Sequence, residues 1–528
     1  MSEEPSKRLF RRLGVVLYWV LSAIPFLWLY HRGLWCWFFG DDFSLLLLAA
    51  FPDKEFWEAF FQPRAQGTFR PLSERLFFYF FYGWFGFDAF PYRLLVFGTQ
   101  IVNLWLLAAL TNRLTGKRLA GFAAASLWGV HHGLSSSMTW TSAYNQVLCA
   151  FFLLLSFLLF LRFAESGRKR YYAAQWITFA LGLGALETMV VYPAVLLAYV
   201  LIAHRRLWRH AAVMLPGSAA FAWMQLSAAP TASEGVYQTN FGLASLAAGF
   251  WHYTQRALVA DEIASLAIAM VIAAVAFAAY QAWRGVLLGV FMLAWFAITL
   301  GPYLPLPDHR LDYYLVLPSM GIAMLTGWAA SLAFVAFGSG ARPALGSSPP
   351  AGAVVQKPQT AAESSRLRLV ETIFERAPAR IVFQVGVVLF AGTFVFASAG
   401  RADREVSYFQ PLSLAVKQLV SDTSRVRAEY PGKTILLANV PEMVFYLSMV
   451  HDAFRAVGVY DVYLTPDSRI SQRADVEHPI EQYFFPASET LIALERRQAL
   501  VFDASGPRLL NITPRYSKLA PLKLGGER

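Results

Sequence analysis

The residues best suited to acid–base chemistry form an acidic pair, Asp41 and Asp42, which follows a long apolar stretch. Two neighbouring carboxylates cannot both ionise freely in a low-dielectric cleft, so one of them could acquire the raised pKa of a general base. The pair could instead cap the helix that follows, because aspartate is a favoured helix N-cap. The sequence therefore offers Asp41 and Asp42 as catalytic candidates and leaves the capping role open.

Three arginines could bind an anion near this pair. A guanidinium group offers paired donors that match phosphate oxygens, and Arg70, Arg256 and Arg310 lie in polar segments between apolar stretches. Arginines near a membrane interface also reach toward lipid headgroups without any substrate role. That alternative fits Arg310 less well than Arg70, because the segment 308–312 around Arg310 is too polar for simple anchoring.

A histidine pair, His131 and His132, could ligate a metal together with Asp or Glu. Adjacent histidines on a helix point in different directions, so hydrogen bonding to substrate or to loop backbone is the favoured interpretation. No metal ligand is therefore assigned, although a divalent cation could take part. The remaining candidate substrate-binding residues are polar side chains predicted to share one face of the protein: Tyr144, Asn145, Glu187, His309 and Asp312.

The composition shows what kind of scaffold must position these residues. Of the 528 residues, 57% are hydrophobic and 15% are charged, against about 25% charged in soluble domains. Residues 1–400 contain 48 charged residues and residues 401–528 contain 31, so the charge-poor part is followed by a tail of soluble composition. The net charge of +11 lies almost wholly in loops of the apolar part, which argues against nucleic-acid binding.

About eleven apolar stretches are long enough to cross a membrane, since a span needs roughly 17–25 mostly apolar residues. We expect an α-helical multi-pass membrane protein with a small C-terminal α/β soluble domain. The predicted spans are 14–30, 92–110, 119–133, 145–163, 171–186, 188–203, 211–227, 263–282, 286–303, 313–337 and 380–399.

The distribution of basic residues predicts the orientation. No cleavage site follows the first span, which we interpret as an uncleaved anchor with a cytoplasmic N-terminus. Inner loops then hold 21 of the 29 basic residues of the apolar part, as the positive-inside rule requires. The candidate residues gather on the outer face, and the tail lies outside. The expected location is the plasma membrane, the inner membrane in bacteria, with an outer-leaflet site for an anionic lipid headgroup.

The expected membrane domain is 1–337, with a large first outer loop at 31–91. Within that loop, the aromatic segment 77–90 is typical of an interfacial helix on the outer leaflet. Residues 338–379 are predicted to form a flexible cytoplasmic linker, rich in Gly, Ser, Pro and Ala. Its segment 366–376 is basic and amphipathic, and could lie on the inner membrane surface or be an ordinary solvated loop.

The last span, 380–399, leads into an extracytoplasmic α/β domain at 400–528. Residues 434–439 and 459–464 have the pattern of buried strands, and 441–456 has that of a helix, which gives a strand–helix–strand order. No glycine fingerprint for a nucleotide follows either strand. We therefore expect the domain to serve recognition or structure and not catalysis.

The order of these motifs resembles that of integral-membrane glycosyltransferases of the GT-C fold, nearest to the protein O-mannosyltransferase-like branch and its bacterial relatives. Two positions depart from that pattern: a histidine often found near 92–97 is missing, and Leu186 stands where the family usually has lysine. The motifs that carry the resemblance are Asp41-Asp42, the segment 69–73, Tyr92-Arg93, Val102-Asn103, Val130-His131-His132, Trp140, the segment 142–145, Glu187-Thr188 and the segment 310–321.

The resemblance implies a polyprenyl-phosphate-linked sugar as donor, hexose or mannose-like, and transfer with inversion to a protein, lipid or glycan acceptor outside the cytoplasm. Carried over from the family, Asp41 would be the general base, and Asp42 would shape the site or bind a cation. Two alternatives stay open. A lipid-linked glycan transporter would usually show internal repeats, and we see none. A non-catalytic membrane scaffold would fit the two departures.

Overall fold

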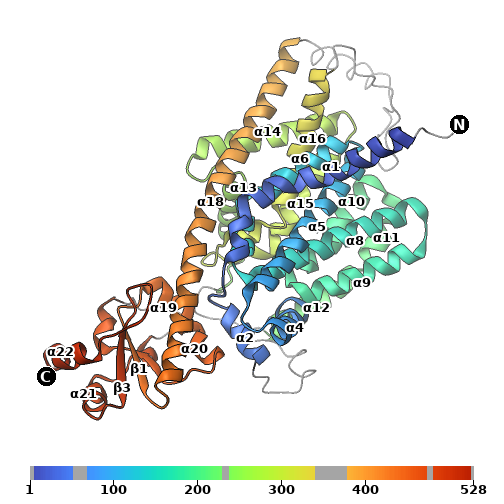
Figure 1. Cartoon of the computed structure of the whole chain (residues 1–528). Coiled ribbons are helices and arrows are strands. Elements are labelled where there is room, and N and C mark those ends of the chain that lie inside the picture. The colour runs from blue at the N-terminus through green and yellow to red at the C-terminus, as the bar shows by residue number, and fades with distance from the viewer. Residues whose placement is uncertain (1–4, 51–67, 229–236, 339–376, 472–479, 525–528) are drawn as a thin grey trace, which may run out of the picture.

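The computed structural model describes residues 5–50, 68–228, 237–338, 377–471 and 480–524, and it is mostly helical (Figure 1). Each predicted span coincides with a helix over most of its length. The basic segment 366–376 and nearly all of the predicted linker lie outside the described residues. The helices that correspond to the predicted spans are α1 (Pro5–Tyr30), α5 (Ala89–Thr115), α6 (Arg118–Gly129), α8 (Tyr144–Ser166), α9 (Lys169–Ala185), α10 (Tyr192–Ala203), α12 (Leu215–Ala228), α14 (Ala264–Trp283), α15 (Leu288–Leu300), α16 (Ser319–Gly338) and α18 (Ala377–Glu429).

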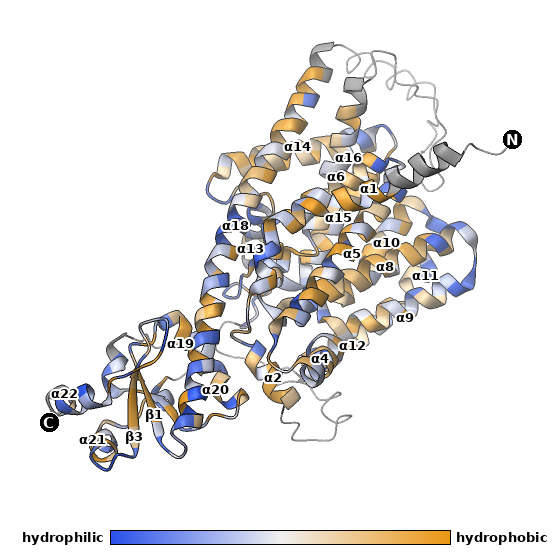
Figure 2. Ribbon diagram, in the orientation of Figure 1, coloured by the Kyte–Doolittle hydropathy of each residue, from blue (hydrophilic) through white to orange (hydrophobic). Residues whose placement is uncertain are grey.

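Apolar residues dominate this helical body, as Figure 2 shows. Within the described ranges, four helices are long and apolar enough to cross a membrane by length and composition: Ala89–Thr115, Thr141–Ser166, Ala264–Trp283 and Ile381–Glu429. Three shorter apolar helices are Glu187–Ala203, Leu288–Tyr303 and Ser319–Phe334. The chain is thus a membrane protein with apolar helices, and the count of about eleven crossings stays a prediction.

Some helices are shorter than the spans predicted for them, because the chain changes from α-helix to 3-10 turn at one end. A 3-10 turn at Glu187–Val191 precedes α10, and another at Gly301–Tyr303 follows α15. The indoles of Trp128 and Trp295 donate to the carbonyls of Val316 and Leu317, each at 3.0 Å. Two buried tryptophans thereby fix the segment that leads from Arg310 into α16.

The described part of the first outer loop forms short helices: α2 (Asp42–Ala50), a π-helical turn at Pro71–Leu76, and α4 (Phe77–Phe85). Helix α4 matches the first part of the predicted aromatic segment. Phe77 and Phe78 are buried, whereas Tyr79, Phe80 and Trp84 are exposed. Such an exposed aromatic face is typical of a helix at a membrane interface.

Helix α18 runs the length of the body and continues past residue 400 without a break (Figure 1). A small sheet follows it. The sheet has the order β2-β1-β3-β4, with β1 parallel to β2 and β3 and with β4 antiparallel to β3. The predicted strand–helix–strand order is present in β1, α19, α20 and β2, whereas β3 and β4 were not predicted. The elements are β1 (Thr434–Ala438), α19 (Glu442–Ser448), α20 (Ala453–Ala456), β2 (Val462–Leu464), α21 (Ala487–Glu495), β3 (Ala499–Asp503), β4 (Leu510–Asn511) and α22 (Thr513–Leu524).

Helix α16 packs closely against α6, and the absence of a side chain at Gly327 permits this. A Cβ atom at Gly327 would lie 2.7 Å from both the Ala120 carbonyl oxygen and the Ala124 nitrogen. We expect Gly327→Ala to lower the thermal unfolding midpoint in detergent, because overpacking typically costs about 1–3 kcal/mol. The matched control is Gly98→Ala in α5, where a Cβ would meet no described atom within 4 Å. Equal midpoints for the two variants would contradict the prediction.

Candidate active site

The two residues of the acidic pair have different environments. Asp42 is fully buried, and its Oδ1 accepts hydrogen bonds from the backbone nitrogen and the hydroxyl of Ser142, both at 2.6 Å. Its Oδ2 accepts a bond from the Phe39 nitrogen at 3.3 Å. Asp42 therefore ties the start of α2 to the turn at Thr141–Ala143, and these bonds are not those of an N-cap of the following helix.

Burial raises the pKa of Asp42 to about 6, although the bonds from Ser142 and Phe39 oppose that rise. The closeness of two carboxylates in the sequence predicted a raised pKa for one of them. The physical cause is instead the loss of solvent around Asp42. The oxygens of Asp42 accept hydrogen bonds from Phe39 and Ser142. Asp42 is therefore placed to stabilise the turn and not to face a substrate.

Asp41 is the accessible member of the pair, with 38% of its side chain exposed. Its Oδ1 lies 3.2 Å from Nδ1 of His451, which belongs to the 3-10 turn Met449–His451 after α19. A carboxylate in this position can receive a proton from a group that approaches from solvent. Sequence reasoning missed His451, because 410 positions separate it from Asp41 along the chain.

Arg70 pairs with two carboxylates. Its Nε and Nη2 donate to the two oxygens of Glu187 at 2.7 and 2.6 Å, and its Nη1 donates to Glu74 at 2.8 Å. Burial alone would lower the pKa of the Arg70 guanidinium, but Glu187 and Glu74 outweigh burial and raise it. A phosphate at Arg70 would have to compete with both carboxylates, and Glu187 likewise has a strong partner within the protein.

Arg256, near the end of α13 (Leu243–Ala257), also pairs with two carboxylates. Its Nε and Nη2 contact Asp312 at 2.9 and 3.0 Å, and its Nη1 contacts Asp261 at 2.8 Å. Arg401 of α18 donates to both oxygens of Asp261 at 2.8 and 2.6 Å. Partial burial would raise the pKa of Asp261, but these arginines outweigh it and hold that pKa below its usual range. The ion pairs join three separate segments.

Arg310 differs from the other two candidate arginines. Within the residues that the structure describes, no carboxylate pairs with Arg310, and its Nε is buried without a hydrogen-bond partner. The neighbouring His309 packs its ring against Tyr237, with centroids 4.4 Å apart. A buried donor without a partner is costly, so Arg310 is the candidate arginine best prepared to bind an anion.

His131 and His132 are buried, and their rings stack with centroids 4.7 Å apart. The expectation that they diverge on a helix is wrong, because α6 ends at Gly129 before the pair begins. His131 accepts a bond from the Gly133 nitrogen at 3.0 Å and contacts the Ala257 carbonyl at 3.2 Å, so it binds loop backbone. His132 lies 3.5 Å from Asp312. No cluster of metal-ligating residues occurs in the described part of the chain.

Tyr144 and Asn145 are buried at the start of α8. The ring of Tyr144 packs against Phe77 with centroids 4.5 Å apart, and its hydroxyl lies 3.3 Å from that of Thr99. Among the residues that the structure places, Oδ1 of Asn145 is buried without a hydrogen-bond partner. Tyr144 thus positions the aromatic helix α4, whereas Asn145 keeps an acceptor available.

Aromatic rings connect the turn that carries Asp41 and Asp42, here called the acidic turn, with the segment that carries Arg310. Phe39 stacks on Trp140 at 6.4 Å, and Trp140 meets Tyr313 edge to face at 6.2 Å. Tyr313 in turn contacts Tyr314 at 4.7 Å, and the ring of His309 lies 5.9 Å from Tyr314. A series of ring contacts therefore links a residue near the acidic pair with the residue that precedes Arg310.

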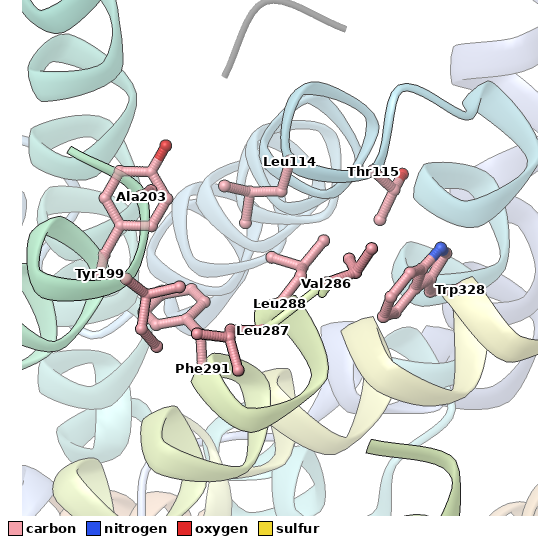
Figure 3. Close-up of a pocket in the computed structure, with 10 residues that line it drawn as sticks. Leu114, Thr115, Tyr199, Ala203, Val286, Leu287, Leu288, Phe291 and Trp328 are labelled. Carbon is pink, nitrogen blue, oxygen red and sulfur yellow. The ribbon is translucent and has the colours of Figure 1, made fainter. Parts of the chain in front are cut away.

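A separate small cavity lies between α5, α10, α15 and α16 (Figure 3). Its volume is about 70 Å³, and its walls are mostly apolar, with Leu114, Tyr199, Phe291 and Trp328 among the lining residues. None of the candidate site residues lines this cavity. It is therefore distinct from the acidic turn and the arginine clusters.

Helices α18 and α19 supply contacts that the sequence did not reveal. The Ser398 hydroxyl accepts from the His132 nitrogen at 2.9 Å, and the Ser413 hydroxyl accepts from the Trp37 nitrogen at 3.1 Å. The Leu447 carbonyl accepts from the Gly40 nitrogen at 2.9 Å. These partners lie more than 260 positions apart, and no spacing or composition signal along one sequence could have paired them.

Comparison with known families shows that residues 70–227 match the family described as dolichyl-phosphate-mannose-protein mannosyltransferase. The match confirms the predicted resemblance to membrane glycosyltransferases. It includes Arg70, the histidine pair and Glu187, whereas the acidic pair precedes it. No curated protein matches the chain in sequence.

Solved structures that align with the chain are distant in sequence. ArnT from Cupriavidus metallidurans bound to undecaprenyl phosphate has a TM-score of 0.40 and 13% identity, over 96% of this chain and 94% of that one. The apo form of the same protein has a TM-score of 0.43 and 12% identity, over 97% of this chain and 95% of that one. A third structure is that of the archaeal oligosaccharyltransferase AglB from Archaeoglobus fulgidus in complex with an inhibitory peptide and a dolichol-phosphate. It has a TM-score of 0.45 and 11% identity, over 94% of this chain and 70% of that one.

The buried carboxyl of Asp42 predicts a pH-dependent stability. Its pKa of about 6 in the folded chain lies above the ordinary 3.8, so the folded state holds this proton more tightly than the unfolded state. The stabilisation from Asp42 is therefore complete below about pH 4 and falls as pH rises through 6. From pH 4 to 7, wild type should lose about 2 kcal/mol of unfolding free energy relative to Asp42→Asn. Thermal unfolding in detergent at both pH values checks this, and parallel pH profiles would contradict it.

Proposed function

We propose that this chain, whose residues 70–227 match the dolichyl-phosphate-mannose-protein mannosyltransferase family, is a GT-C-type glycosyltransferase. It moves a hexose, mannose-like, from a polyprenyl-phosphate donor to a hydroxyl of a protein, lipid or glycan acceptor, with inversion at the anomeric carbon. The family match supports the reaction class. The sugar, the acceptor class and the stereochemistry are part of the proposal.

The observation that carries the mechanism is the division of roles between the two aspartates. Asp42 is fully buried among donors, whereas the side chain of Asp41 is 38% exposed. In the proposed step, Asp41 takes the proton of the acceptor hydroxyl while the oxygen of that hydroxyl attacks the anomeric carbon. The bond from that carbon to the phosphate oxygen breaks, and its electron pair leaves with the polyprenyl phosphate. The products are a glycosylated acceptor and polyprenyl phosphate.

The leaving phosphate needs a cation that is not already neutralised. Arg70 and Arg256 each contact two carboxylates, whereas the buried Nε of Arg310 has no hydrogen-bond partner in the described structure. A fixed guanidinium in a water-poor site stabilises the negative charge that develops on the departing phosphate. We therefore assign the phosphate to Arg310 and give Arg70 and Arg256 structural roles in holding the outer segments together.

The proposed topology places this chemistry outside the cytoplasm. The body at 1–337 would hold the polyprenyl chain along its apolar helices, with the loop 31–91 over the outer leaflet. The linker 338–379 would lie inside and the domain 400–528 outside. The inward excess of basic residues supports this orientation. The proposed location of the protein is the plasma membrane.

The role of Asp41 predicts a specific loss of activity. Asp41→Asn keeps the size of the side chain but removes the base, so donor turnover should fall by about 100-fold or more. The measurement is conversion of radiolabelled polyprenyl-phosphate mannose to polyprenyl phosphate in membranes that contain the expressed chain. Glu262→Gln, which alters an exposed carboxylate, is the matched control and should keep full turnover. Full turnover by Asp41→Asn at equal expression would refute the assignment.

The role of Arg310 predicts a loss of donor binding. Hydrogen bonds to a charged group contribute about 1.5–3 kcal/mol, so Arg310→Gln should weaken binding of polyprenyl phosphate by about 10-fold to 100-fold. Direct binding of polyprenyl phosphate to the purified protein in detergent measures this. Arg404→Gln, an exposed arginine on α18, serves as the control. An unchanged dissociation constant for Arg310→Gln would move the phosphate site elsewhere.

A further inference from the structure

The region after α18 docks onto the turn that carries the proposed base. Helix α20 packs against α2, and the Gly40 nitrogen donates to the Leu447 carbonyl at 2.9 Å. Figure 1 shows α2 and α20 next to each other at the end of the body where α18 meets the sheet. The acidic turn is therefore covered by a segment that sequence analysis assigned to a separate, non-catalytic domain.

Gly40 gives the turn its backbone conformation at this contact. Its φ of +60° is the left-handed conformation that L side chains rarely adopt. A Cβ at Gly40 would lie 3.8 Å from Cδ2 of Leu447, 3.8 Å from Nε1 of Trp140 and 4.0 Å from Nε2 of His451. The imidazole of His451 thus lies directly beside the backbone of the turn, with its other nitrogen 3.2 Å from Asp41.

We propose that His451 is a positioning residue for Asp41 and that the C-terminal domain thereby completes the active site. The imidazole donates its Nδ1 proton to Oδ1 of Asp41, which holds the carboxylate in one orientation toward the acceptor hydroxyl. This inference rests on the proposed function, because it gives His451 a role only if Asp41 is the base. A group that orients a general base acts on the rate of the chemical step.

The geometry favours this role over a purely structural contact. The domain is already docked by the Leu447 carbonyl bond and by the packing of α20 on α2, neither of which needs an imidazole. His451 adds a polar contact to the one accessible carboxylate of the turn. Its side chain is 23% exposed and that of Asp41 is 38% exposed, so the pair borders solvent from which an acceptor can approach.

The test compares four variants by steady-state turnover of labelled polyprenyl-phosphate mannose and by thermal unfolding. His451→Ala should lower kcat by about 10-fold or more, since a hydrogen bond to a charged group is lost, while KM for the donor changes less than about 2-fold. His451→Asn places an amide donor near the position of Nδ1 and should restore most of the rate. Leu447→Ala trims the docking contact but keeps the imidazole, and Met443→Ser changes an exposed residue of α19; both should stay near wild type.

Each result decides between the explanations. If the wild type turns over donor and Asp41→Asn does not, but His451→Ala stays near wild type, the inference is wrong and the proposed function stands. If Leu447→Ala and His451→Asn lose as much activity as His451→Ala, His451 is only a docking residue, which also overturns the inference. If His451→Ala fails to fold, His451→Phe, which fills the space without a donor, replaces it. If the wild type does not turn over donor, the proposed function fails and the inference fails with it.

Discussion

The buried carboxylate of Asp42 is the constraint on which the arrangement of the site depends. A charged or polar group without solvent is costly unless it is hydrogen-bonded, and Asp42 meets this demand with three bonds from Phe39 and Ser142. These bonds attach the first outer loop to the segment before α8. Because successive residues of the turn point in different directions, fixing Asp42 inward also fixes Asp41 outward, beside His451.

Other partly buried charges are also paired, and their partners lie on different segments of the chain. Arg70 joins the π-helical turn to the segment after α9, and Arg256 and Arg401 join α13 and α18 through Asp261. Partly buried ion pairs of this kind persist because removal of one partner would leave an uncompensated charge. The candidate arginines at these joints each pair with two carboxylates, whereas the buried Nε of Arg310 has no hydrogen-bond partner among the described residues. This difference is the reason for proposing Arg310, and not Arg70 or Arg256, as the residue that binds the phosphate.

Sequence patterns predicted the elements better than the partners. Apolar runs located the helices, and short buried strands located β1 and β2, because these signals are local. The partner of each polar group could not be predicted, since Asp42 and Ser142 are 100 positions apart and Asp261 and Arg401 are 140 apart. The raised pKa of one aspartate was anticipated from the neighbouring charge, but burial causes it. Helices α6 and α10 are shorter than the apolar stretches predicted there, because apolar composition continues through the 3-10 turns beside them.

The central claim is that one site at the acidic turn accepts the phosphate of a lipid carrier. A cryo-EM structure of the full chain with bound polyprenyl phosphate tests it most directly. The account predicts the phosphate within hydrogen-bond distance of the Arg310 guanidinium, with the carboxylate of Asp41 bordering the same space. A phosphate bound instead beside Tyr199 and Trp328, at the apolar cavity among α5, α10, α15 and α16, would contradict both the site and the proposed orientation.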